Sequence, residues 1–206
     1  MTSYSQFGED DIIIRYFNHF KGVLLDIGAN DGVTLSNSRA LIEKGWGADL
    51  VEPAAIPYKK LAKLYKDNSL IKLHNYAIDN ESGLCNFYES TSLFNIKDSG
   101  LLSTIKENYL VNVYQTNFTQ YEIETLSFKD FQEKSLYKKW DFINIDTEGC
   151  DWDILQQINL IEVDCKCLCI EYNGHNPGIY IDYCKNYNLS LLYQNDINLI
   201  LCKKNQ

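Results

Sequence analysis

Short apolar runs alternate along the chain with segments whose apolar residues recur at the period of a helix. A strand buried on both faces reads as an unbroken apolar run, whereas a helix packed on a sheet repeats every 3.6 residues. The runs that read as strands are 23–27, 47–51, 71–79, 140–145, 163–172, 189–193 and 197–202. The segments that read as helices are 12–20, 39–44, 56–65, 128–137, 152–158 and 179–186. This order predicts an α/β fold with a mostly parallel sheet.

The last two apolar runs are separated by only Gln194, Asn195 and Asp196. A parallel crossover needs a dozen or more residues. A link of this length can therefore only join antiparallel strands. If both runs lie in the sheet, the last strand therefore runs against its neighbour. A dinucleotide-binding sheet does not need this ending.

The turn after the first strand, Gly28-Ala29-Asn30-Asp31-Gly32, indicates a nucleotide or nucleoside site. It differs from Gly-x-Gly-x-x-Gly, because Asn30 stands where the second glycine lets backbone approach a diphosphate. Asp26, at the ligand end of the strand, would repel phosphate and attract an amine. S-adenosylmethionine, which has an α-amino group and a sulfonium but no phosphate, fits this pattern. The alternative is a turn that only joins the strand to a helix capped by residues 36–38.

The second strand ends in an acid, Glu52, followed by Pro53. In nucleoside-binding folds an acid at this place accepts hydrogen bonds from the ribose hydroxyls. The alternative is a helix cap, although Pro53 favours a directed loop. Asp79 follows the third apolar run, where adenine edges commonly lie in such folds, so we expect it beside the adenine ring of the cofactor.

Two carboxylates, Asp146 and Glu148, follow the strand at 140–145. In an extended segment residues i and i+2 face the same way, so both should converge at the ligand end of the sheet. They could hold an amine, accept a hydroxyl proton or coordinate a divalent cation. The alternative is capping of the next helix. Glu171 and His175 follow the next strand and add a carboxylate and an imidazole at the same end, with His175 a further candidate base.

Residues 89–119 form a long polar stretch between two alternating runs, 84–88 and 121–126. We expect these runs to pair as strands and the stretch between them to act as a lid or substrate loop, since long loops in compact domains are usually functional or disordered. The polar lead-in to the first helix, which contains Gln6, could also fold over the ligand.

The chain of 206 residues has a net charge of −9 and a pI of about 4.8. Its length predicts a single domain, 1–206. Its acidity argues against nucleic-acid or anionic-membrane partners, since binding to phosphates rests on Lys and Arg. No apolar run is long enough to span a membrane and no signal peptide opens the chain. The seven cysteines lack a metal-binding spacing and are read as packing residues in a reducing compartment, the cytoplasm.

Several of these motifs together resemble the FkbM family of S-adenosylmethionine-dependent methyltransferases. The resembling segments are 5–10, 26–32, 45–47, 51–53 and 145–149, in the expected order along the chain. The resemblance implies a class I methyltransferase (Rossmann-like) fold: a seven-stranded, mostly parallel sheet with an antiparallel last strand and helices on both faces. It also implies O-methylation, often of sugars or other hydroxylated metabolites.

Carried over by motif, the family's cofactor site places Asp26, Gly28 and Asn30 at the methionine part of the cofactor. Glu52 would hold the ribose and Asp79 would lie near adenine. Asp146 and Glu148 would face the reacting group. The complete set of predicted cofactor-binding residues is Gln6, Asp26, Gly28, Asn30, Asp31, Glu52, Pro53, Asp79 and Ser103, the last through a loose match to a serine-bearing loop.

These observations predict an O-methyltransferase acting on a hydroxyl of a sugar or glycan. A hydroxyl needs a base to take its proton, and Asp146, Glu148 and His175 are the candidates. A divalent metal held by Asp146 and Glu148 could acidify the hydroxyl instead, and the sequence does not choose between them. A nicotinamide-dependent oxidoreductase and a non-catalytic nucleoside-binding module stay as alternatives.

Overall fold

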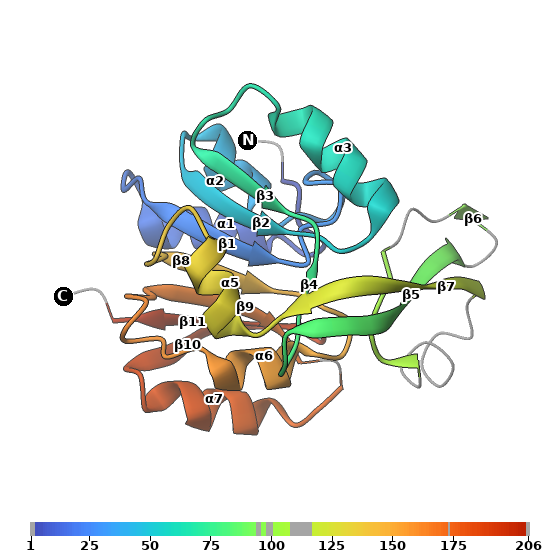
Figure 1. The fold of residues 1–206 in the computed structure, drawn as a ribbon. Coiled ribbons are helices and arrows are strands. Elements are labelled where there is room, and N and C mark those ends of the chain that lie inside the picture. The colour runs from blue at the N-terminus through green and yellow to red at the C-terminus, as the bar shows by residue number, and fades with distance from the viewer. Residues whose placement is uncertain (1–2, 94–95, 98–100, 108–116, 173, 205–206) are drawn as a thin grey trace.

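A seven-stranded sheet forms the centre of the computed structural model, which describes residues 3–93, 96–97, 101–107, 117–172 and 174–204 (Figure 1). Its spatial order is β10-β11-β9-β8-β1-β2-β3. The strands are β1 (Val23–Ile27), β2 (Gly47–Val51), β3 (Ile71–His74), β8 (Phe142–Ile145), β9 (Cys167–Glu171), β10 (Leu189–Gln194) and β11 (Asn198–Lys203). Successive crossovers start in the middle of the sheet and wind toward both edges, so the carboxyl ends of β1, β2, β8 and β9 meet at one side.

The direction of the last strand confirms the prediction made from its short link. Strand β1 pairs in parallel with β2 and β8, and β8 with β9. In contrast, β11 runs antiparallel to both β9 and β10. The sheet is therefore mostly parallel with a reversed last strand, as expected.

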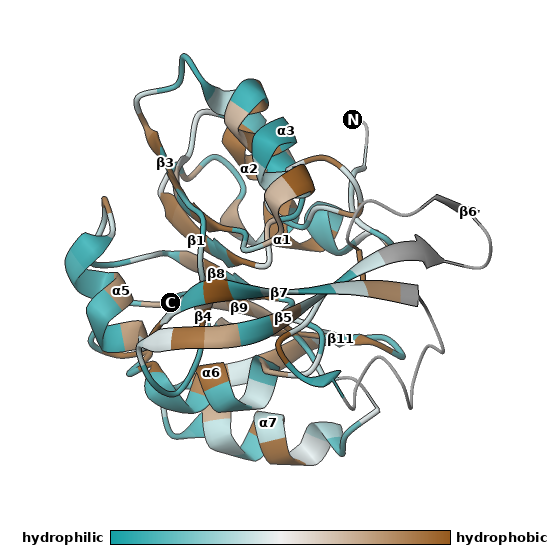
Figure 2. Cartoon of the chain, turned by 45° about the vertical axis from the view of Figure 1, so that its right-hand side comes forward, coloured by the Kyte–Doolittle hydropathy of each residue, from teal (hydrophilic) through white to brown (hydrophobic). Residues whose placement is uncertain are grey.

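Helices cover both faces of the sheet because neighbouring residues of each strand point to opposite sides. The helices are α1 (Glu9–Phe17), α2 (Arg39–Glu43), α3 (Ala55–Tyr65), α5 (Phe128–Lys134), α6 (Asp151–Gln157) and α7 (Pro177–Lys185). In β1, Leu24 packs with α1–α3, whereas Leu25 and Ile27 pack with α5–α7. Hydrophilic residues lie on the outward sides of α3 and α5 (Figure 2). Within the described part of the chain, no helix is sufficiently long and apolar to span a bilayer.

A second, four-stranded sheet projects from the first as an arm (Figure 1). It contains β4 (Ala77–Ile78), β5 (Gly83–Leu93), β6 (Ile96–Lys97) and β7 (Asn117–Leu126). The expected pairing of 84–88 with 121–126 is confirmed. The single strand expected at 71–79 is wrong: the chain leaves the central sheet after His74, where the Asn75 side chain donates to the carbonyls of Glu52 (2.9 Å) and Pro53 (3.1 Å), and β4 then pairs with β7.

The loop expected at 89–119 is shorter in the structure, because β5 continues to Leu93 and β7 begins at Asn117. Residues 94–95, 98–100 and 108–116 lie outside the described residues. Of the remainder, 101–107 returns along β5. Its Thr104 exchanges backbone hydrogen bonds with Tyr88, at 2.9 and 3.1 Å. The arm thereby carries a segment back to the end of the central sheet.

Two backbone turns touch where β1 and β8 end. Gly28 has φ +95, and a Cβ on it would lie 1.8 Å from the carbonyl oxygen of Asp146. The amide of Asp146 in turn donates to the carbonyl of Ile27 at 2.9 Å. Only glycine combines this left-handed backbone with so close an approach.

We expect Gly28→Ala to lower the free energy of unfolding by about 2–5 kcal/mol, or to prevent folding, because left-handed strain and overpacking both oppose the methyl group. Gly174→Ala is the matched control: it has φ +73 but nothing within 4 Å of a Cβ, so it should cost only the strain, about 1–2 kcal/mol. Urea unfolding measures both values. Equal losses would contradict the account of the contact with Asp146.

Candidate functional site

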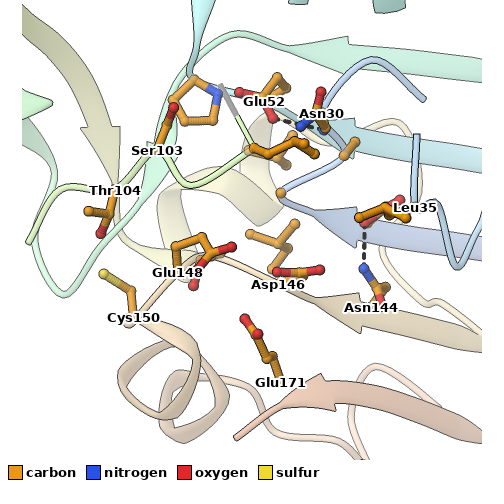
Figure 3. A pocket seen from close by; sticks show the side chains of 18 of the residues that line it. Asn30, Leu35, Glu52, Ser103, Thr104, Asn144, Asp146, Glu148, Cys150 and Glu171 are labelled. Atoms are coloured by element: carbon orange, nitrogen blue, oxygen red, sulfur yellow. Dashed lines mark hydrogen bonds between the residues drawn. The ribbon is translucent and has the colours of Figure 1, made fainter. Parts of the chain in front are cut away.

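One cavity of about 340 Å³ opens at the carboxyl ends of β1, β2, β8 and β9 (Figure 3). The turn after β1 and the acid after β2 line one side, and the turn after β8 lines another. The returning segment of the arm, Leu101 to Ile105, also lines it. The volume lies at the lower end of the range of small-molecule sites.

Most of the predicted site residues meet at this cavity. Those that line it are Gln6, Asp26, Gly28, Asn30, Glu52, Pro53, Ser103, Asp146 and Glu148. Residues from the N-terminal segment and the middle of the chain are thus gathered at one place. Their individual roles stay predictions.

Three predicted residues do not line the cavity. Asp31 turns back on its own loop, where its carboxylate accepts from the amides of Val33 (3.0 Å) and Thr34 (2.8 Å). Asp79 follows β4 into the arm, and its carboxylate accepts from the amide of Asn80 at 2.8 Å. His175 is exposed in the loop before α7. The geometry therefore gives no support to Asp79 as an adenine contact or to His175 as a base.

Asp26 is buried at the end of β1, and each of its carboxylate oxygens accepts a hydrogen bond from a side chain. One carboxylate oxygen accepts from the Ser38 hydroxyl, and the other accepts from the Asn144 amide at 2.9 Å. Burial raises the pKa of Asp26, and the two hydrogen bonds oppose that rise. Ser38 was expected to cap α2, but its hydroxyl is directed to Asp26 instead.

Glu52 holds the turn after β1 from the neighbouring strand. Its carboxylate accepts from the amide of Asn30 at 2.8 Å (Figure 3) and from the amide of Ala54 at 2.6 Å. Burial raises the pKa of Glu52 to about 8, and the negative charge of Asp26 adds to the rise. The acid predicted to bind ribose hydroxyls thus also fixes the glycine turn.

Three carboxylates, of Asp146, Glu148 and Glu171, converge at the centre of the cavity (Figure 3). One oxygen from each lies within 4.8 Å of the others. The reason given for their convergence was wrong, because the segment is not extended: Glu148 has φ +54 and Gly149 has φ +106. The turn, rather than strand alternation, brings Glu148 toward Asp146.

The three carboxylates share a strongly acidic environment. Burial raises the pKa of Asp146 to about 7, and the Asp151 charge adds to the rise. Burial and the charge of Asp146 raise the pKa of Glu171 to about 12, which favours the protonated form at neutral pH, and Glu171 is hydrogen-bonded to Asp146. Among the residues described as lining the cavity, none is lysine, arginine or histidine. The cluster can take up a proton, an amine or a divalent cation.

Asn37 and Asn144 are among the lining residues that the predicted set missed. Asn144 was detectable in principle, because it is the one polar residue within the buried strand β8, whose other residues are Phe142, Ile143 and Ile145. Asn37 was read as part of a helix cap, and its sequence position alone gives no sign of its location.

Comparison with known proteins decides the family. A model of the FkbM methyltransferase domain matches residues 26–194, which is most of the chain. The chain belongs to the FkbM methyltransferase family. The matched region contains the glycine turn, the acid after β2 and the three clustered carboxylates. No curated protein matches the chain.

A solved structure supports the fold of this FkbM domain. It resembles methyltransferase FkbM from Methylobacillus flagellatus KT, with a TM-score of 0.54 and 16% identity over 88% of this chain and 43% of that one. The chain thus spans less than half of that protein's length. It also resembles M. capricolum TrmK bound to S-adenosylhomocysteine (TM-score 0.48, 13% identity, 98% and 70% covered) and a putative caffeoyl-CoA O-methyltransferase from Staphylococcus aureus (TM-score 0.49, 14%, 98% and 85%). Scores below 0.5 bear on neither function nor substrate.

The raised pKa of Glu171 makes the stability of the FkbM domain depend on pH. The folded state holds this proton more tightly than the unfolded chain, whose glutamates titrate near 4.5, so stability falls as pH rises above about 4.5 toward the folded pKa. We expect Glu171→Gln to flatten this decline and to stabilise the ligand-free domain at pH 9 by at least about 1.4 kcal/mol, the equivalent of one pKa unit.

Denaturant unfolding between pH 5 and 9 measures this effect. Glu133→Gln, at an exposed glutamate of α5, is the matched control and should keep the wild-type slope. A Glu171→Gln slope equal to that of the wild type would show that the carboxylate cluster does not oppose folding.

Proposed function

We propose that this FkbM domain transfers a methyl group from S-adenosylmethionine to a hydroxyl of a small, neutral, sugar-like acceptor. The observation that carries the proposal is a single cavity that joins a diphosphate-excluding glycine turn to a buried acid after β2 and to a carboxylate cluster. The family match supports methyl transfer. The acceptor class is our inference from the charge of the cavity.

The cofactor fits the residues that line the cavity. Each oxygen of Glu52 accepts one backbone hydrogen bond, and a carboxylate has about four acceptor positions, so Glu52 retains capacity for ribose hydroxyls. The side chain of Asn30 stands where a diphosphate would require glycine. These two features favour a nucleoside without a diphosphate and disfavour a nicotinamide dinucleotide.

When bound, the cofactor supplies an electrophilic methyl group on a sulfonium, and transfer to a hydroxyl oxygen releases the hydroxyl proton. The domain must orient the hydroxyl, exclude water and accept that proton. Asp146, with a pKa of about 7, is partly ionised at neutral pH and is half-buried beside the cavity. It is therefore our candidate base, with Glu171 hydrogen-bonded to it.

A divalent cation is the second candidate role of the same carboxylates. Asp146, Glu148 and Glu171 offer oxygen ligands that suit a hard cation, and a bound cation would relieve their mutual repulsion. Such a cation would acidify the acceptor hydroxyl, so that a base with a high pKa would no longer be needed. The two roles differ in their response to a chelator.

The charge of the cavity favours a neutral acceptor over an anionic one. Its acids face no lysine, arginine or histidine among the described lining residues, and the chain as a whole carries −9. Nucleic acids bind through basic side chains that pair with phosphates, and a uronate or phosphorylated sugar has the same need. An uncharged carbohydrate hydroxyl has no such need.

We also propose that residues 1–206 act as one domain in which the arm contributes to acceptor binding, since its segment from Leu101 to Ile105 lines the cavity. A cytoplasmic location stays a prediction. It is supported by the seven cysteines, which are all free thiols.

Binding measurements test the cofactor. We expect calorimetry to detect S-adenosylhomocysteine binding and to detect no NAD⁺ binding, because Asn30 blocks the approach of a diphosphate. Binding of NAD⁺ alone would favour the oxidoreductase alternative and would contradict the proposal.

Transfer of label from methyl-labelled S-adenosylmethionine tests the reaction. Incubation with a neutral glycan extract should label the glycans, whereas an RNA preparation should stay unlabelled. Label in RNA would contradict the acceptor class, and cofactor binding without transfer to either extract would favour a non-catalytic module.

Treatment with EDTA distinguishes the two roles of the carboxylates. Retained activity supports Asp146 as a base, and activity that is lost and then restored by Mg²⁺ supports a cation.

A further inference from the structure

Asn37 carries a buried acceptor atom that the protein does not satisfy. The residue lies just before α2, is 4% exposed and lines the cavity. Its Nδ2 donates to Oδ1 of Asn144 at 3.1 Å and contacts Sγ of Cys169 at 3.6 Å. Its Oδ1 is buried and has no hydrogen-bond partner among the described residues.

The orientation of the Asn37 amide follows from Asp26. The Asp26 carboxyl accepts from Nδ2 of Asn144 at 2.9 Å, and this hydrogen bond sets the orientation of the Asn144 amide. Oδ1 of Asn144 then faces Asn37, which must donate its own Nδ2 in return. If the Asn37 amide were flipped, its Oδ1 would face Oδ1 of Asn144, and neither oxygen can donate a hydrogen bond. The relay from Asp26 through Asn144 therefore fixes Oδ1 of Asn37 as the atom left without a donor.

An unsatisfied buried carbonyl is unfavourable, and such atoms in native proteins call for an explanation such as a missing ligand donor. The donor must come from the cavity, because Asn37 lines it and the surrounding protein atoms supply none. The same wall contains the carboxyl group of Asp26. A donor with a positive charge suits this wall better than a neutral hydroxyl, which would find stronger acceptors at Glu52.

We propose that Oδ1 of Asn37 accepts a hydrogen bond from the α-ammonium group of S-adenosylmethionine, an inference that rests on the proposed function. An ammonium has three donors and no acceptor, so it fits a carbonyl beside a carboxylate. Asp26 is then a positioning residue: it is buried, and through its hydrogen bond with Asn144 it sets the direction of the Asn37 amide. This changes the role predicted for Asp26, which was direct contact with the amine.

Calorimetry with two ligands tests the assignment. One ligand is S-adenosylhomocysteine, and the other is its analogue in which hydrogen replaces the α-amino group. We expect Asn37→Ala to weaken S-adenosylhomocysteine binding about tenfold, equivalent to about 1.4 kcal/mol, and to leave binding of the deamino analogue within about twofold of wild type. Wild-type protein should bind the analogue about tenfold more weakly than S-adenosylhomocysteine.

Two controls accompany the variant. Asn86→Ala, at an exposed asparagine of β5 in the arm, should bind both ligands as the wild type does. Retained affinity of Asn37→Ala for the deamino analogue shows that the cavity is intact, independently of any change in stability.

Equal losses for both ligands in Asn37→Ala would overturn the assignment, because Asn37 would then act on the cavity as a whole or on the nucleoside. Unchanged affinity for both would overturn it as well. Wild-type protein that binds neither ligand would instead overturn the proposed function, and this inference with it.

Discussion

The contact between the turns after β1 and β8 determines where the functional groups of this domain lie. Gly28 lets the two backbones approach until a Cβ would stand 1.8 Å from the carbonyl of Asp146. The register of the two strands then places Asp26 beside Asn144. One close backbone approach therefore sets the geometry of the amide relay on one side of the cavity and the start of the carboxylate cluster on the other.

The domain bears the cost of burying several acids at one place, and it compensates each differently. Asp26 is stabilised by side-chain donors, and Glu52 by two backbone amides. Among the described residues, no such set of donors faces Asp146 and Glu171, and the raised pKa of Glu171 favours a proton that relieves their repulsion. Such a cavity binds a cationic ligand with favourable electrostatic energy. A cofactor that carries a sulfonium and an ammonium group is a ligand of this kind.

Much of the fold and the position of the site follow from the sequence, because apolar runs mark the strands and the acids at their ends mark the ligand side. The amide relay could not be predicted, since Asp26, Asn37 and Asn144 become neighbours only through the register of β1 with β8. Asp79 was placed at the cavity because β3 was extended too far, whereas hydrogen bonds from Asn75 end that strand and send the chain into the arm.

A crystal structure of the domain with S-adenosylhomocysteine tests the central claim most directly. The account predicts ordered ligand between the glycine turn at 28–32 and Glu52, with the ribose hydroxyls within 3.2 Å of the Glu52 carboxylate, a usual limit for hydrogen bonds. Ligand bound outside this cavity, or bound in it with the ribose directed away from Glu52, would contradict the account.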